Sequence, residues 1–156
     1  MLKCDLSKYS KFRPQTNHGP ALPNRIVFAM RHYEKDFIDE IPKILSSRKR
    51  RVVKHLPFYH AAVLVPLFQK RGEFYLLLTK RSDHVKYHKG QISFPGGAAK
   101  EEDSSLEKAA LREAFEEIGL HERDVQIIGL LDDVVTHTSE FIVTPHCWPH
   151  PISVSF

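Results

Sequence analysis

Apolar residues in this chain form short runs with the spacing of strands and longer stretches with the spacing of helices. Runs rich in β-branched and aromatic residues predict strands over residues 61–68, 74–79, 92–94, 125–135 and 141–144, with a turn at residues 71–72. A looser helical pattern predicts a helix over residues 34–48, which Pro42 should kink or delay. Strands on both sides of a second helical segment favour an α/β (α+β) domain, in which helices pack on a mixed sheet.

The second helical segment carries its own start and stop signals. Ser104 and Glu107 have the spacing of a capping box, and Gly119 stands where a left-handed cap ends a helix. At 3.6 residues per turn, the buried face should carry Leu111, Phe115 and Ile118. Ala109 and Ala110 are small residues beside the polar face, which would leave room for a ligand there.

That polar face carries the candidate chemistry. Glu113, Glu116 and Glu117 fall within one helical turn, where three carboxylates repel each other unless a cation binds them. Hard oxygen ligands suit Mg²⁺ or Mn²⁺. Arg112 is placed to orient the carboxylates. The alternative is a solvated acidic face with an ordinary surface ion pair.

A sharp turn comes shortly before this helix. Pro95 fixes one backbone dihedral, and Gly96 and Gly97 are free to adopt positive φ. A glycine pair also allows the backbone to approach a phosphate or a metal closely. By itself such a turn is more often a plain loop, but its position before the acidic helix favours a binding role.

Together these residues resemble the signature of the Nudix hydrolases. Residues 112–120, REAFEEIGL, match its second half throughout, whereas Asp103 stands where the signature has Glu, and eight residues instead of seven separate it from Arg112. The longer spacing is similar to that of the coenzyme A pyrophosphatase subgroup. The resemblance covers roughly residues 58–145 and implies a Nudix-type mixed β-sheet sandwiched by helices.

An upstream motif strengthens the resemblance to that subgroup. Residues 77–82 read LLTKRS, Gly90 follows, and the motif ends at the FPGG of residues 94–97, with Lys86 where Arg is usual. The resemblance implies that Arg81, Lys86, Lys89, Gly96 and Gly97 bind substrate phosphates, although Lys lacks the two-point fork of Arg. A solvated lysine-rich loop is the alternative.

The resemblance implies hydrolysis of the pyrophosphate of coenzyme A to 3′,5′-ADP and 4′-phosphopantetheine, assisted by Mg²⁺ or Mn²⁺. Glu113, Glu116, Glu117 and Arg112 would form the catalytic set, with the three glutamates as metal ligands. The carboxylate that takes the proton from water is left open; Glu140 is available, but a surface glutamate is the simpler interpretation. ADP-ribose, another nucleoside diphosphate derivative, a non-catalytic binding module and an inactive truncated product remain alternatives.

Composition and organisation complete the expectations. The 156 residues suffice for one domain, carry a formal charge of +4, and contain no apolar run of about 18 residues that could span a membrane. The predicted parts are an irregular extension over 1–29, a helix and basic segment over 30–55, the Nudix domain over 56–145, and an atypical tail over 146–156 that suggests truncation or a frame change. We expect a small-molecule substrate, no nucleic-acid or membrane partner, and a cytoplasmic location, or an organellar one if residues 1–29 are a leader. The basic residues 48–51 are interpreted as a solvated helix end.

Overall fold

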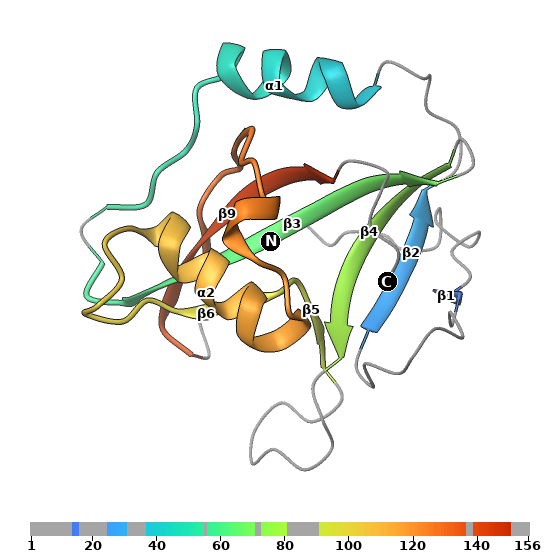
Figure 1. The fold of residues 1–156 in the computed structure, drawn as a ribbon. Coiled ribbons are helices and arrows are strands. Elements are labelled where there is room, and N and C mark those ends of the chain that lie inside the picture. Colours follow the sequence, from blue (N-terminus) through green and yellow to red (C-terminus); the bar gives the residue numbers. More distant parts are fainter. Residues whose placement is uncertain are drawn as a thin grey trace.

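The computed structural model describes residues 14–15, 25–30, 37–54, 56–70, 73–80, 91–136 and 139–150. Their elements in chain order are β1 (Pro14–Gln15), β2 (Arg25–Met30), α1 (Phe37–Ser47), β3 (Tyr59–Lys70), β4 (Glu73–Lys80), β5 (Ile92–Ser93), β6 (Gly96–Ala98), α2 (Leu106–Ile118), the 3₁₀-helix η2 (Glu122–Asp124), β7 (Gly129–Leu130), β8 (Val134–Thr136) and β9 (Phe141–His150) (Figure 1). In this part of the chain, no helix is long and apolar enough to cross a membrane.

The strands of the described residues form one sheet in the order β1-β2-β4-β3-β9-β7, with β5, β6 and β8 attached to β4, β3 and β9. The central strand β3 pairs antiparallel with β4 and β6 and parallel with β9. The sheet is therefore mixed, and α2 lies across it (Figure 1). The predicted fold class is confirmed.

The face of β3 that α2 covers is set by the period of two in a strand. Ala62 and Leu64 are fully buried. Ala62 packs with Ala109 and Ala110 of α2, and Leu64 packs with Ala114 and with further core residues, Leu77, Ile118, Leu120 and Trp148. The small residues at this interface let the helix backbone lie close to the sheet.

Several predicted strands are confirmed, and one is wrong. Strands β3, β4 and β5 cover the predicted runs with small changes at their ends, while residues 71–72 lie outside the described part. The single strand predicted over residues 125–135 is two short strands, β7 and β8. Both short strands pair antiparallel with β9, and they are separated by residues 131–133, where Asp132 and Asp133 bind arginines from a distant segment.

The predicted end of the last strand at residue 144 is also wrong. Strand β9 runs on to His150 and stays in parallel register with β3 as far as Phe68. Its alternate residues are buried, in the order Ile142, Thr144, His146 and Trp148. Histidine and proline made this stretch read as irregular, but the period of two continues through it. Residues 151–156 lie outside the described part.

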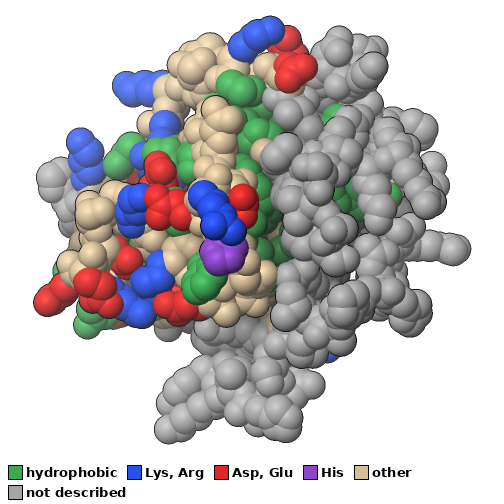
Figure 2. Space-filling view, viewed as in Figure 1, with side chains coloured by type: hydrophobic (Ala, Val, Ile, Leu, Met, Phe, Trp, Pro, Cys, Tyr) green, Lys and Arg blue, Asp and Glu red, His purple; other side chains and the backbone are tan. Residues whose placement is uncertain are grey.

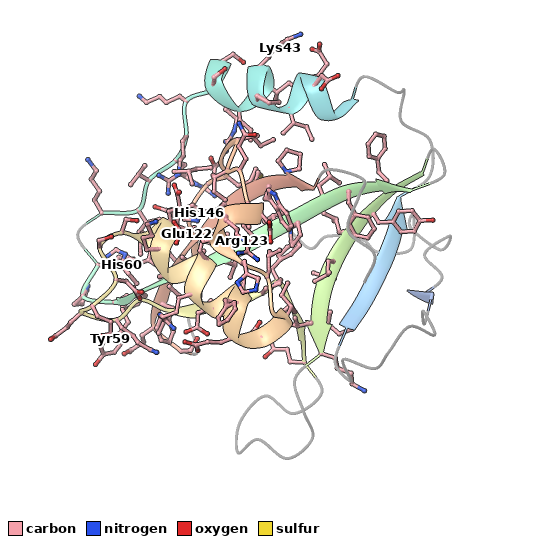
Figure 3. All side chains as sticks on the ribbon, in the orientation of Figure 1. Lys43, Tyr59, His60, Glu122, Arg123 and His146 are labelled. Atoms are coloured by element: carbon pink, nitrogen blue, oxygen red, sulfur yellow. The ribbon has the colours of Figure 1, made fainter. Side chains whose placement is uncertain are left out.

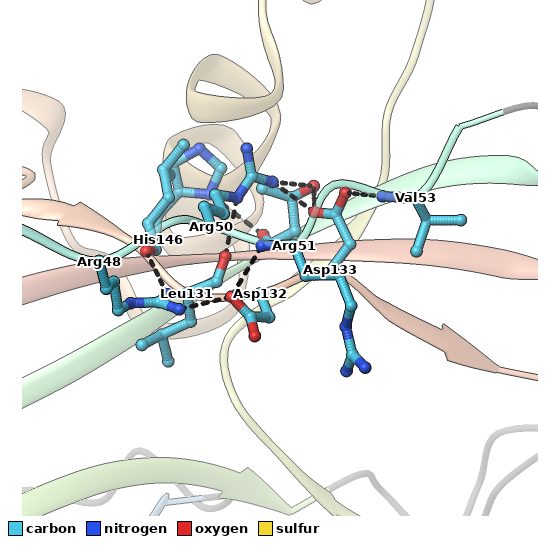
Figure 4. Close-up of polar contacts among 10 residues, drawn as sticks. Arg48, Arg50, Arg51, Val53, Leu131, Asp132, Asp133 and His146 are labelled. Carbon is cyan, nitrogen blue, oxygen red and sulfur yellow. Dashed lines mark hydrogen bonds and ion pairs between the residues drawn. The ribbon is translucent and has the colours of Figure 1, made fainter. Parts of the chain in front are cut away.

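The N-terminal region differs from its prediction as well. The irregular structure expected over residues 1–29 is wrong where β1 and β2 form, since β2 pairs antiparallel with β4 from Arg25↔Thr79 to Met30↔Phe74. Helix α1 confirms the predicted helix and continues through Pro42. Beyond it, Arg48 and Arg50 are not a solvated helix end: both are partly buried and pair with Asp132 and Asp133 (Figure 4).

Candidate active site

Helix α2 begins one residue later than the capping-box prediction. Ser105, rather than Ser104, is the N-cap, and its Oγ accepts a hydrogen bond of 3.2 Å from the N–H of Lys108. The predicted C-terminal cap is confirmed, since Gly119 has φ of 69° and donates its N–H to the carbonyl of Phe115 at 2.9 Å. The helix is thus fixed at both ends by local contacts.

The buried face of α2 is only partly the predicted one. Leu111 and Ile118 are buried, but Phe115 is 49% exposed and its ring lies 4.9 Å from the ring of His121. Ala109 and Ala110, expected to border a ligand, are fully buried against β3 instead. Because α2 lies close to the sheet at these positions, small alanine side chains fit there, and the large ring of Phe115 lies outside the contact.

The glycine turn is built into the sheet beside α2. The carbonyl of Pro95 accepts a hydrogen bond of 2.8 Å from Leu64, and β6 pairs with β3. Gly96 has φ of +151°, and a Cβ there would lie 2.3 Å from the carbonyl oxygen of Ala62. Only glycine fits this position, for both its backbone angle and its space.

The turn and the acidic face meet directly. A Cβ on Gly97 would lie 2.7 Å from Cδ and from Oε2 of Glu113, so that carboxylate sits over the backbone of the turn. The N–H of Gly96 donates to Oε2 of Glu117 at 3.4 Å. The structure therefore brings together four of the residues named from the sequence: Gly96, Gly97, Glu113 and Glu117.

Arg112 links this site to the loop before the helix. Its Nε donates to Oδ1 of Asp103 at 3.0 Å and its Nη2 to Oδ2 at 2.9 Å. Its Nη1 lies 2.6 Å from Oε1 of Glu113 and 3.4 Å from Oε1 of Glu116, and its Nη2 also reaches the carbonyl of Ala98 at 3.1 Å. Arg112 orients carboxylates, as the sequence suggested.

Asp103 is the residue that the sequence reasoning missed. It was noted as a departure from the family signature and was given no role, yet its side chain is 5% exposed and binds Arg112 at two points. The N–H of Lys100 adds a hydrogen bond of 2.9 Å to Oδ2. These hydrogen bonds, led by those from Arg112, lower the pKa of Asp103 to about 2. The pKa of Arg112 is raised by the same partner.

The three glutamates fit a divalent ion in donor type. Within the described residues, no three His, Cys, Asp or Glu side chains converge on one point as they stand. Glu113 and Glu116 are turned towards Arg112, and Glu116 also lies 3.9 Å from Nζ of Lys100. Carboxylate oxygens are nevertheless the ligands that Mg²⁺ and Mn²⁺ prefer. An ion would be held by Glu113, Glu116 and Glu117.

Both acidic and basic side chains surround the site. Acidic and basic side chains alternate over α2 and its neighbouring loops on the face shown in Figure 2. Figure 3 shows Glu122 and Arg123 beside α2, and Tyr59 and His60 near the start of β3. The remaining predicted substrate-binding residues, Arg81, Lys86 and Lys89, lie outside the described residues.

Comparison with known families agrees with this geometry. The family described as NUDIX domain matches residues 58–155, which include β3, the glycine turn, α2 and β9. The chain belongs to the Nudix family.

Curated Nudix relatives carry no substrate in their names. The uncharacterized Nudix hydrolase NudL of Yersinia enterocolitica is 46% identical over 98 residues, which are 63% of this chain and 49% of that protein. Nudix hydrolase 3 of Caenorhabditis elegans is 38% identical over 124 residues, 76% of this chain and 51% of that protein. The chain spans about half the length of the curated relatives it matches.

Solved Nudix structures share the fold. The Nudix hydrolase RenU of M. smegmatis has a TM-score of 0.50 at 20% identity, covering 66% of this chain and 68% of that one. A C. elegans Ap4A hydrolase in a binary complex has a TM-score of 0.51 at 20% identity, covering 62% and 69%. At this level of identity the likeness establishes the Nudix fold alone.

Proposed function

We propose that this chain is a divalent-metal-dependent Nudix pyrophosphatase with coenzyme A, or one of its derivatives, as substrate. The products would be 3′,5′-ADP and 4′-phosphopantetheine. The observation that carries the proposal is the meeting of Glu113 and Glu117 with the Gly96–Gly97 turn. Carboxylates beside a glycine backbone provide oxygen ligands for a divalent counter-ion next to a turn that has no side chains of its own.

The chemistry follows from the charge of the substrate. Nudix hydrolases generally use divalent metal ions, which neutralise phosphate oxygens and ease deprotonation of water. In this chain, Glu113, Glu116 and Glu117 would hold the ion. Arg112 fixes the Glu113 carboxylate, and Asp103 fixes Arg112.

The choice of coenzyme A rests on the upstream motif. Its first part, residues 77–79, lies in β4, and its last part, residues 94–97, follows β5. Strands β4 and β5 pair as Thr79↔Ser93 and Lys80↔Ile92, with Oγ1 of Thr79 donating to the carbonyl of Ser93 at 3.3 Å. Residues 80 and 92, which flank the segment that contains Arg81, Lys86 and Lys89, are therefore paired, and β5 leads directly into the glycine turn. This supports a role for these cations in holding substrate phosphates.

Mass-spectrometric product analysis tests the proposal. The purified chain is incubated with coenzyme A and Mg²⁺ or Mn²⁺, with ADP-ribose in a parallel reaction, and the Glu117→Gln variant is the matched blank. Formation of 3′,5′-ADP and phosphopantetheine, blocked by EDTA, is the expected result. Cleavage of ADP-ribose alone would retain the pyrophosphatase chemistry and reject coenzyme A. Absence of turnover with both would reject the proposed activity of this chain.

A cytoplasmic location stays a prediction.

A further inference from the structure

Ion pairs and hydrogen bonds attach the segment that follows α1 to residues 130–133. Arg48 Nη1 pairs with Oδ1 of Asp132, and its Nη2 donates to the carbonyl of Leu130 at 2.9 Å. Arg50 pairs with Oδ1 of Asp133. These pairs join positions more than 80 residues apart in the sequence. The segment 48–53, here called the strap, thus lies along residues 130–133, from the end of β7 to the start of β8 (Figure 4).

Backbone groups of the strap use the same two aspartates. The N–H of Arg51 donates to Oδ1 of Asp132 at 3.1 Å, and the N–H of Val53 donates to Oδ2 of Asp133 at 2.9 Å. In return, the N–H of Asp133 donates to the carbonyl of Arg51 at 3.0 Å. The two carboxylates therefore hold both side chains and backbone, and loss of either would free several groups at once.

Compared with the polar contacts of the strap, the apolar contacts that attach α1 to the sheet are few. Leu45 packs against Gly129, where an added Cβ would lie 2.7 Å from a Leu45 methyl carbon. Among the other isoleucines of α1 whose burial is described, Ile41 is half-buried and Ile44 is 52% exposed. In Figure 1, α1 extends past the edge of the sheet instead of covering its face. In the described residues, attachment of 37–54 to the sheet therefore depends heavily on the ion pairs of the strap.

The two ion pairs differ in their access to solvent. The side chains of Arg48 and Asp132 are 29% and 39% exposed, whereas Asp133 is 3% exposed and also accepts a hydrogen bond of 2.8 Å from Oγ1 of Thr144 in β9. Salt screens exposed charges much more than buried ones. The outer pair is therefore the weak point, and the inner pair anchors the strap to the sheet.

We propose that the strap detaches reversibly from the sheet. The Arg48–Asp132 pair breaks first and α1 is released, while the sheet stays folded. Ionic conditions then control whether the N-terminal helix is docked on the domain. Local opening of this kind is expected where contacts are polar, partly exposed and few. The strap precedes residues 58–155 that match the Nudix family, whereas its partners Asp132 and Asp133 lie within them.

Amide hydrogen exchange of the full chain tests the proposal. The reporters are the amides of Arg51 and Val53, which bind the two aspartates, and the amide of Leu64, which binds the carbonyl of Pro95 in the sheet. Exchange is compared between about 0.1 M and about 1 M NaCl, over which the screening length falls from about 10 Å to about 3 Å. We expect the Arg51 amide to exchange about tenfold faster at high salt, the Val53 amide to follow less strongly, and the Leu64 amide to remain unchanged.

Variants separate strap opening from general loosening. Asp132→Asn should produce at low salt the fast exchange that salt produces in the wild type. Asp124→Asn is the matched control, because that carboxylate is exposed and lies 3.9 Å from its neighbour Arg123. Arg48→Met tests the same pair from its other side. Equal acceleration of all three amides, or slow exchange of Arg51 under every condition, would overturn the proposal.

Discussion

Arg112 holds Asp103 in a two-point fork, with Nε 3.0 Å from Oδ1 and Nη2 2.9 Å from Oδ2. A planar guanidinium bound in this way cannot rotate freely. Its remaining nitrogen, Nη1, is then fixed 2.6 Å from Oε1 of Glu113. Asp103 is thus a positioning residue, because it acts on Glu113, the candidate metal ligand, through Arg112.

Replacing Asp103 by Asn should weaken catalysis without unfolding the domain. The amide keeps the size of the side chain but loses the charge and one acceptor, so Arg112 no longer has a single orientation. Loss of such an outer partner typically lowers metal affinity or activity about 10–100-fold. Mn²⁺ titration of the purified protein and kcat measurement check this, with Glu101→Gln as an exposed control in the same loop. Unchanged Mn²⁺ affinity would show that the fork has no positioning role.

Asp103 should also contribute to acid sensitivity. Its pKa is lowered from 3.8 to about 2 in the folded chain, chiefly by the hydrogen bonds from Arg112. A lowered folded-state pKa stabilises the protein above the unfolded value and loses that contribution as pH falls through the folded one. Stability should therefore decrease between about pH 4 and about pH 2. Urea unfolding midpoints measured over this range should fall less steeply for Asp103→Asn than for the wild type.

The two glycines of the turn should respond differently to alanine. Gly96→Ala places a Cβ 2.3 Å from the carbonyl oxygen of Ala62, in backbone of the central strand, and at a positive φ. It should lower the thermal midpoint or prevent folding. Gly97→Ala meets only the end of the flexible Glu113 side chain, at 2.7 Å. It should retain the thermal midpoint while displacing that carboxylate and lowering kcat. Similar thermal midpoints for both variants would contradict this assignment.

Local determinants explain which parts could be predicted. The cap at Gly119 and the glutamate face of α2 depend on neighbours within one or two turns, so the sequence reveals them. The predicted burial of Phe115 is wrong because periodicity gives only a direction on the helix, and the positions that pack against the sheet are taken by residues such as Ala109, Ala110 and Ile118. The loop of Arg81, Lys86 and Lys89 stays a prediction.

Long-range pairing explains what could not be predicted. Arg48 and Asp132 are separated by 84 positions, and no local sequence pattern indicates which carboxylate pairs with a given arginine. Trp148 likewise sits beside Pro66 only because β9 runs parallel to β3. The fold class follows from the order of elements, whereas the partner of each strand and charge depends on the tertiary structure.

Glu117→Gln should abolish most turnover and leave the fold intact. Glu117 is an exposed residue on α2 whose carboxylate accepts a hydrogen bond of 3.4 Å from the N–H of Gly96, and an exposed side chain contributes little to the core. Removing a group that stabilises charge at a reacting centre commonly lowers kcat about 100-fold or more. Turnover of coenzyme A and thermal unfolding are measured together, with Glu107→Gln in the first turn of α2 as the control. Wild-type turnover would refute the assignment of Glu117 as a ligand.

Trp148→Ala should strongly destabilise the domain, because the end of β9 belongs to the core. The Trp148 side chain is 2% exposed and packs with Leu64, Leu77 and Ile118. Truncating a buried tryptophan typically lowers the free energy of unfolding by about 3–5 kcal/mol. Chemical denaturation gives this quantity, with Val134→Ala at a 54% exposed position of the neighbouring strand as the control. Were residues 146–150 an irregular tail, both variants would unfold at the wild-type midpoint; a loss confined to Trp148→Ala places the strand inside the folded unit.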